Sequence, residues 1–231
     1  MKMKKTSTHT KIINTIAEVF DKLSEEYKKR SEYGFIYIIF SGVVNLLWLI
    51  NFVEWFKFIF YQLCKFIMKD ISRKAAYNWA IDIFVVVKFV FLILFMLMPD
   101  NAIILKIVIY LLIMNVFTYF YHHVWRKPSD SCSHWQTRRF ANLMLAIVFN
   151  ILCYTYLLGN GLARYILWEN GTPASLYSVL QYSISNTFLL SSSLSVVNAF
   201  GLYLQTSQQI VSFIFLVIIL SQSIPKPAKE D

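Results

Sequence analysis

Charge is scarce in this chain for its length. Only 15% of its 231 residues are charged, whereas 57% are hydrophobic and 17% are aromatic. An ordinary soluble domain carries about 25% charged residues. The charges are also unevenly placed, because long apolar runs alternate with short basic segments. This pattern excludes a typical soluble domain and predicts an all-α, polytopic membrane protein with four to six membrane segments.

Cysteine is rare as well, and the sequence lacks the common catalytic patterns. Cys64, Cys132 and Cys153 have no paired spacing, which argues against a disulfide framework. The first 32 residues are polar, so we expect no cleavable signal peptide. There is no serine–histidine–acid arrangement, no phosphate-binding loop and no pair of intramembrane carboxylates. We therefore expect neither enzyme activity nor a cofactor.

The formal net charge of +9 is carried by loops that flank apolar runs. Such charge sets membrane topology, so we expect no nucleic-acid partner. One basic loop also contains the possible zinc ligands His122, His123, Cys132 and His134. Their spacing matches no familiar site, and adjacent histidines point in different directions. An aromatic, histidine-rich membrane interface explains the same residues, and we predict no metal.

The apolar runs approach the length of about 20 residues that a transmembrane helix needs. Before the first of them, residues 11–30 alternate apolar and charged side chains at helical spacing. This segment predicts an amphipathic helix, lying either on the membrane surface or on its own protein. The runs cover residues 35–53, 80–98, 103–121, 141–158 and 199–219.

Residues 54–69 have a different pattern, with an apolar face opposite a charged one formed by Glu54, Lys57, Lys65 and Lys69. The segment is either an interfacial helix or the short second leg of a hairpin that begins with residues 35–53. The hairpin yields six membrane segments. A first run that dips into the bilayer without crossing yields four spans. We prefer the hairpin, although its second leg is short.

Lysine and arginine placement predicts the orientation. Residues 1–32 hold eight basic and five acidic residues, residues 54–78 five and two, and residues 123–140 four and one. The positive-inside rule places these segments and both termini in the cytoplasm, and we favour the plasma membrane. We divide the chain into a cytoplasmic amphipathic helix (1–34), membrane helices with an interfacial helix (35–137), a pore-like domain (138–224) and a cytoplasmic tail (225–231).

Two charges lie inside an apolar run, at Asp82 and Lys88. Six residues separate them, which is roughly 120° around a helix, so they do not form a direct pair. A charge inside a span costs a few kcal/mol or more unless it faces the bundle interior, a cavity or a partner. Lys88 therefore either contacts Asn115 or Asn150 on neighbouring helices or extends to an interface.

The last 95 residues have the most informative layout. An outer helix (138–158) precedes a short amphipathic run at 174–188, a serine-rich stretch and a final helix. Irregular backbone at membrane depth is tolerated where it is buried in protein or lines water. A re-entrant helix that faces a water-filled cavity meets this condition. The alternatives are a serine-rich loop between two helices and an ordinary short span.

From Arg138 to Ile224 the chain resembles the pore domain of the tetrameric potassium-channel superfamily. The resemblance is carried by Leu176-Tyr177-Ser178-Val179, by Phe200-Gly201 and by the apolar run Ile210–Leu220. It implies an outer helix, a re-entrant pore helix, a filter of backbone carbonyls and an inner helix. This chain departs from the family at the filter, because no glycine lies between Gly171 and Gly201.

We therefore hypothesise a channel-like protein with a degenerate filter, in which hydroxyl and amide groups line a less selective path for monovalent cations. Four copies in the lipid bilayer would surround one pore. Strong voltage sensing is not expected, because the helix before the basic loop carries only Lys106. The filter candidates are Ser183, Ser185, Asn186, Thr187, Ser191 and Ser192, and those on the inner helix are Gln205, Ser207, Gln208, Ser212 and Ser221.

The alternative hypothesis is a non-conducting membrane interaction, scaffold or immunity protein that acts through partner contacts. The sequence also contains a glycosylation sequon, Asn170-Gly171-Thr172, on the side predicted to lie outside. It is relevant only in a eukaryotic secretory membrane.

Overall fold

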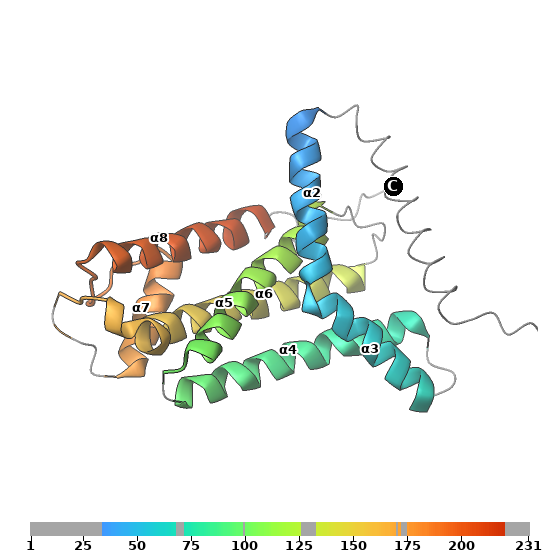
Figure 1. Cartoon of the computed structure of the whole chain (residues 1–231), viewed down its shortest axis with the longest axis horizontal. Coiled ribbons are helices and arrows are strands. Elements are labelled where there is room, and N and C mark those ends of the chain that lie inside the picture. Colours follow the sequence, from blue (N-terminus) through green and yellow to red (C-terminus); the bar gives the residue numbers. More distant parts are fainter. Residues whose placement is uncertain are drawn as a thin grey trace, which may run out of the picture. The chain divides into compact units, whose positions relative to one another are not determined.

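The computed structural model describes residues 34–67, 72–98, 100–125, 133–169, 171 and 175–219 (Figure 1). Regular structure in these ranges is helical, apart from one isolated antiparallel bridge between Trp168 and Val196. The chain divides into two compact units, residues 1–50 and 51–231. The predicted amphipathic helix at residues 11–30 and the C-terminal tail lie outside the described residues.

The described part of the first unit is a single helix, α2 (Phe35–Ile50), which carries no charge. Its 16 residues extend about 24 Å, less than the roughly 30 Å of a hydrocarbon core. The predicted apolar run of residues 35–53 is therefore not one continuous helix, because the next helix starts at Phe52. Alone, α2 is too short to count as a candidate span.

The second unit begins at Asn51, whose polar side chain starts a new helix, α3 (Phe52–Ile67). The Asn51 Oδ1 atom accepts a hydrogen bond from the Val53 backbone N–H at 3.1 Å. Its Nδ2 atom donates to Thr118 Oγ1 on α5 (Ala102–Phe120) at 3.0 Å. An asparagine inside an apolar run thus caps α3 and ties it to α5.

Helices α3 and α4 (Arg73–Leu97) form an antiparallel pair. Near the start of α3 the ring of Phe56 lies 5.5 Å from that of Phe84, and near its end Tyr61 lies 5.9 Å from Tyr77. The 16 residues of α3 are too few to cross the bilayer alone. Helix α3 reaches the length of a span only when it is counted together with α2.

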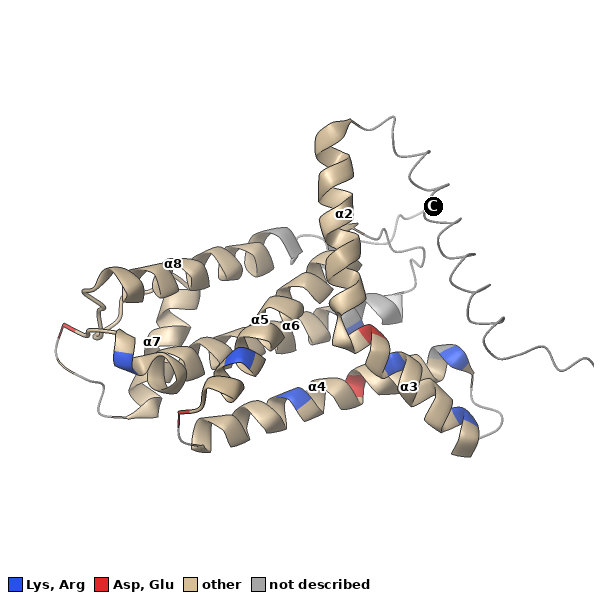
Figure 2. Cartoon of the chain, viewed as in Figure 1, with Lys and Arg blue, Asp and Glu red and all other residues tan. Residues whose placement is uncertain are grey.

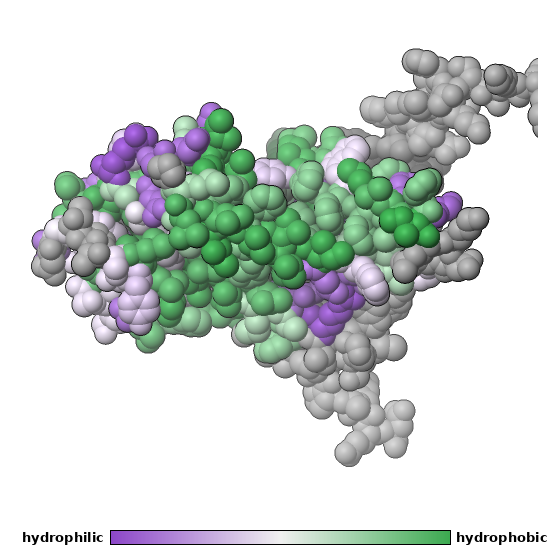
Figure 3. Space-filling model, turned by 90° about the horizontal axis from the view of Figure 1, so that it is seen from below, coloured by the Kyte–Doolittle hydropathy of each residue, from purple (hydrophilic) through white to green (hydrophobic). Residues whose placement is uncertain are grey.

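Within the described ranges, four helical segments are long and apolar enough to cross a membrane by themselves. They cover Ala75–Leu97, Ala102–Phe120, Phe140–Gly161 and Ala199–Val217. Apolar surface extends across the middle of the face seen in Figure 3, with hydrophilic residues gathered at its margins. The chain is therefore an all-α, polytopic integral membrane protein, as the alternation of apolar and basic segments predicts.

The central helix of the second unit is α6 (Ser133–Tyr156), which continues as a π-helical turn at Leu157–Gly161. In its most apolar stretch 67% of the residues are buried, against 17–28% in the corresponding stretches of the other three spans. Phe149 and Cys153 of α6 pack with Leu92 of α4 and Val108 of α5 in one hydrophobic cluster. The final elements are α7 (Leu176–Thr187) and α8 (Ala199–Phe213), the latter extended to Ile219 by a π-helical segment.

Candidate functional site

Helix α7 starts beside the C-terminal end of α6 and runs back along it. The Ser175 hydroxyl caps α7 by accepting a hydrogen bond from the Ser178 N–H. Gly159 allows the close approach, because a Cβ there would lie 2.8 Å from Leu176 Cδ1. Two turns further along α7, Ser183 Oγ donates to the carbonyl of Ile151 at 3.0 Å. Since Ile151 precedes Gly159 by eight residues, α7 reaches about 12 Å back along α6.

The far end of α7 is held by Gln208 on α8. Its Nε2 atom lies within hydrogen-bond distance of Ser183 Oγ (2.7 Å), the Ser183 carbonyl (2.8 Å) and Thr187 Oγ1 (3.0 Å). Its Oε1 atom accepts from Asn186 Nδ2 at 2.8 Å. Gln208 lies nine residues after the first residue of α8, or about 14 Å along an axis of about 28 Å. Helix α7 therefore ends beside the middle of α8 and is re-entrant.

The predicted filter candidates separate into two groups. Ser183, Asn186 and Thr187 are buried, as is Gln208, which is 1% exposed, and their side chains bond to one another. We call these four residues the Gln208 cluster. Within the chain they attach α7 to α8. Ser185 is half-buried, and Ser191 and Ser192 are exposed.

The inner-helix candidates also differ in their surroundings. Ser207 Oγ donates to the carbonyl of Leu204 at 2.8 Å and lies 3.2 Å from the hydroxyl of Tyr154 on α6. Ser212 is buried, and Gln205 is half-buried. Sequence reasoning missed Gln209, whose Nε2 atom donates to Asn186 Oδ1 at 3.0 Å. The density of glutamines in this span was the available signal. Ser221 lies outside the described residues.

The chain reverses after α7 without a glycine. Leu189 adopts a left-handed conformation with φ of +56°, and the Leu190 N–H donates to the Ser185 carbonyl at 2.8 Å. This is a Schellman ending, in which glycine is the usual residue at the left-handed position. Here a leucine occupies that left-handed position, at a cost of about 1 kcal/mol.

Residues 188–198, which we call the return segment, lead from the middle of α8 back to its start. The segment is irregular, and Leu189, Leu190 and Ser191–Ser193 are exposed. Within the described part of the chain, the backbone N–H groups of Ser191, Ser192 and Ser193 find no hydrogen-bond partner. An amide at membrane depth needs a partner, because lipid chains offer none.

The C-terminal end of the return segment is anchored to residues 165–169. Val197 N–H donates to the Leu167 carbonyl and Glu169 N–H to the Ser195 carbonyl, both at 3.0 Å. Asn198 caps α8 through the Gly201 N–H and donates to the Tyr165 carbonyl at 2.7 Å. The Ser195 hydroxyl bonds to the carboxylate of Glu169. The segment is therefore held at both ends and open between them.

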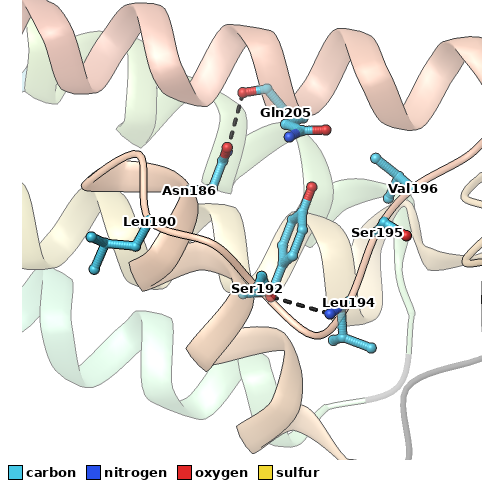
Figure 4. A pocket seen from close by; sticks show the side chains of 8 residues that line it. Asn186, Leu190, Ser192, Leu194, Ser195, Val196 and Gln205 are labelled. Carbon is cyan, nitrogen blue, oxygen red and sulfur yellow. Dashed lines mark hydrogen bonds between the residues drawn. The ribbon is translucent and has the colours of Figure 1, made fainter.

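A cavity of about 120 Å³ lies between α7, the return segment and α8 (Figure 4). In Figure 4 Asn186 and Gln205 meet across it, and Ser192 bonds to Leu194 on the return segment. The hydroxyl of Tyr182 is buried without a partner among the described residues. At about 30 Å³ per molecule the cavity can hold a few waters. Its lining is Tyr182, Asn186, Leu190, Ser192, Leu194, Ser195, Val196 and Gln205.

A second polar group lies among α4, α5 and α6, and of the two alternatives for Lys88 it shows the contact with Asn115. The Lys88 ammonium group donates to Asn115 Oδ1 at 2.7 Å and lies 4.3 Å from the centre of the Phe149 ring. Asn115 Nδ2 donates to Asn150 Oδ1 at 3.2 Å and to the Ala146 carbonyl at 3.1 Å. We call Lys88, Asn115 and Asn150 the Lys88 cluster. All three are buried.

Asp82 has a different partner, as its position on the helix predicts. Its carboxylate pairs with Arg138 of α6 at 2.7 Å, and Arg138 also donates to the Asn78 carbonyl at 2.9 Å. Lys88 and Asp82 thus serve separate helix contacts. The contact of Lys88 with Asn115 places a cation without an acidic partner inside the bundle. The contact of Asp82 with Arg138 pairs two opposite charges near the N-terminal ends of α4 and α6.

Of the four possible zinc ligands, the structure describes the side chain of His122 alone; Cys132 and the side chains of His123 and His134 are not among the described residues. His122 Nε2 lies 3.3 Å from Glu54 Oε1 on α3. The same carboxylate accepts from Lys57 at 2.5 Å. Within the ranges that the structure describes, no three histidine, cysteine or acidic side chains gather closely enough to hold a metal ion. The sequon at Asn170 also lies outside these ranges.

Comparisons with protein-family models, with curated proteins and with solved structures found no match.

Proposed function

We propose that this protein is a homo-oligomeric, channel-like membrane protein that conducts monovalent cations through a pore entered beside the return segment. The observation that carries the water-filled entry is the set of backbone N–H groups at Ser191–Ser193, which have no partner within the described chain. The segment that bears them follows a helix ending halfway along α8. Such amides must meet either water or another protein surface. The preference for cations rests on the serine hydroxyl and amide oxygens nearby.

Water is the better partner on chemical grounds, because the middle of the return segment is polar. Three consecutive serines are exposed there, and the adjacent cavity has hydroxyl and amide groups in its wall. A water-filled entry between copies would satisfy both the backbone and the serine hydroxyls. Oxygen-rich surfaces of this kind suit partly hydrated cations.

The proposal assigns two roles to the polar residues of residues 138–224. The Gln208 cluster positions α7, while Ser185, Ser191, Ser192 and Gln205 are the candidates for contact with the permeating ion. This arrangement has the layout implied by the resemblance to potassium-channel pores, without the glycine-containing filter. We propose a tetramer and, because few charges lie in the spans, little voltage dependence.

The orientation is part of the proposal. Residues 54–78 and 123–140, with their excess of lysine and arginine, would face the cytoplasm together with both termini. The return segment and residues 157–169 would then face the outside. The plasma membrane remains the favoured location.

Reconstitution with thiol labelling tests the proposal. The protein, with Cys64, Cys132 and Cys153 replaced, is purified and inserted into bilayers, and potassium and sodium currents are recorded. Ser192→Cys should react with a charged, water-soluble thiol reagent and lose current when modified. The matched control is Val86→Cys, which is 62% exposed in the chain but lies on an apolar span. It should not react, because lipid excludes the reagent.

The same experiment separates the alternative hypothesis. A monomer without current, together with an unreactive Ser192→Cys, would overturn the channel proposal. A bulky Ser185→Trp that leaves the current unchanged would exclude Ser185 from the pore. Absence of current with labelling that is blocked by a co-purified protein would instead favour a non-conducting interaction protein.

A further inference from the structure

The arginines whose side chains the structure describes are held in different ways. Arg138 pairs with Asp82, and Arg164 lies 3.9 Å from Asp100. Arg73, at the start of α4, has no acidic partner within the described ranges. Among the described residues, no acid therefore neutralises its charge.

Arg73 is nevertheless held in place, by two tyrosines. The centre of its guanidinium lies 5.1 Å from the ring centroid of Tyr77 and 6.0 Å from that of Tyr61. Its Nε atom donates to the Tyr77 hydroxyl at 2.9 Å. Since Tyr61 belongs to α3 and Tyr77 to α4, the antiparallel pair of helices orders the guanidinium. Ordering in advance reduces the entropy lost when a ligand binds.

The sequence around Arg73 is rich in basic residues, and it follows an exposed apolar end of α3. Residues 65–74 contain four basic residues and one acid, Asp70. Figure 2 shows blue ribbon toward the end of α3 and at the start of α4. The last residues of α3, Phe66 and Ile67, are 87% and 77% exposed. A basic segment that follows exposed apolar residues in the sequence has the composition expected at the junction between lipid headgroups and acyl chains.

We infer that Arg73, Tyr61 and Tyr77 form a binding site for the phosphate of an anionic phospholipid. The two terminal nitrogens of the guanidinium bond the phosphate oxygens, as the planar fork of arginine does elsewhere. Lys65 adds positive charge, and Phe66 and Ile67 contact the acyl chains. The site depends only on the α3–α4 pair, so it does not rest on the proposed channel function.

Native mass spectrometry of the full-length protein in detergent tests this inference. Dioleoyl phosphatidylglycerol and dioleoyl phosphatidylcholine are titrated separately, and the bound lipid is counted. The wild-type protein should bind the anionic lipid more tightly. Arg73→Gln should weaken that binding about tenfold or more, the usual worth of a hydrogen bond to a charged group. Arg73→Lys keeps the charge but loses the planar guanidinium, so its affinity for the anionic lipid should lie between those of the wild-type and Arg73→Gln proteins.

The matched control is Arg164→Gln. Arg164 also stacks on a tyrosine, with its guanidinium 4.9 Å from the ring centroid of Tyr165, but it has Asp100 as a partner. Its replacement should leave lipid binding unchanged. Equal weakening by both variants, or no change in Arg73→Gln, would overturn the inference. So would displacement of the lipid by millimolar inorganic phosphate, which would point to a site for free phosphate.

Folding of the variants is measured in the same samples. Tyr77→Phe removes the hydroxyl that orients the guanidinium and keeps the ring, so it should weaken lipid binding severalfold without unfolding the chain. If a variant loses lipid binding together with the thermal transition, the loss is structural. Unchanged binding in a folded Tyr77→Phe protein would contradict the role assigned to the tyrosine pair.

Discussion

The Lys88 cluster and the Gln208 cluster are both buried polar groups within apolar helices, but they solve different problems. The Lys88 cluster joins three continuous helices and contains a full charge that is 7% exposed. The Gln208 cluster contains no charge and joins a helix that stops halfway to one that continues. The Lys88 cluster provides hydrogen-bond partners for a buried charge. The Gln208 cluster fixes the end of a helix that stops beside the middle of its neighbour.

Under the proposed channel function, this difference assigns the two clusters different roles. Around Lys88 the three helices are continuous, and the polar side chains bond mainly to one another. Around Gln208 the side chains hold α7 in a position that leaves the return segment irregular and its amides unpartnered. A protein retains such a segment at membrane depth only where water or a neighbour covers it. Changes in the first cluster should therefore affect stability, and changes in the second should affect conduction as well.

The largest effect is expected from Gln208→Leu. The substitution removes the bond accepted from Asn186 and the contacts of Nε2 with Ser183 and Thr187, of which the two amide hydrogens can make two at a time. Interhelical hydrogen bonds in membranes contribute about 0.6 kcal/mol each, so we expect a loss of about 2 kcal/mol and of all current. Unfolding by dodecyl sulfate in mixed micelles and single-channel recording measure the two effects.

The neighbouring Gln209→Leu serves as the matched control for that change. Gln209 makes one hydrogen bond to the same cluster, so its replacement should cost only about 0.6 kcal/mol and preserve conduction. Equal losses in the two variants would mean that the amide at 208 has no special role. Normal current in Gln208→Leu would show that conduction does not depend on how α7 is held against α8.

The second prediction concerns the Lys88 cluster. Asn115→Leu removes the acceptor for the buried ammonium and should destabilise the fold by about 2 kcal/mol. Lys88→Met removes the charge and keeps much of the side-chain length, and should cost less than Asn115→Leu, because no uncompensated charge remains. Both proteins should conduct normally once folded. Dodecyl sulfate unfolding and liposome flux provide the readouts.

A loss of flux in folded Lys88→Met would break the distinction between the clusters. It would show that the isolated cation contributes to the ion path. Equal destabilisation by Lys88→Met and Asn115→Leu would contradict the view that the amide chiefly compensates the charge.

The smallest effect is expected at the reversal after α7. Leu189→Gly relieves the left-handed strain and removes a side chain that is 72% exposed, so the chain should gain up to about 1 kcal/mol. Unfolding in mixed micelles checks the sign. A loss of stability confined to the oligomer, seen by comparing assembled and dissociated protein, would instead place Leu189 in a contact between copies.

The membrane class and most of the helices could be predicted from the sequence because they depend on local pattern. Runs of apolar residues near 20 in length leave few alternatives to a helix in lipid, and the helices at α4, α5, α6 and α8 follow the predicted runs within several residues. The short helix at α7 and the separation of Lys88 from Asp82 could also be predicted, because helical spacing alone decides which residues share a face.

Tertiary structure decided what the polar residues do. The break at Asn51 depends on a hydrogen bond to Thr118, 67 residues away, and no local pattern in an apolar run reports it. Ser183, Asn186 and Thr187 resembled pore-lining residues in the sequence, yet their side chains meet Gln208 on another helix. Hydrogen-bond partners that are distant in sequence are set by how the helices pack. The sequence by itself therefore determined the spans, and packing decided which polar groups have no hydrogen-bond partner among the described residues.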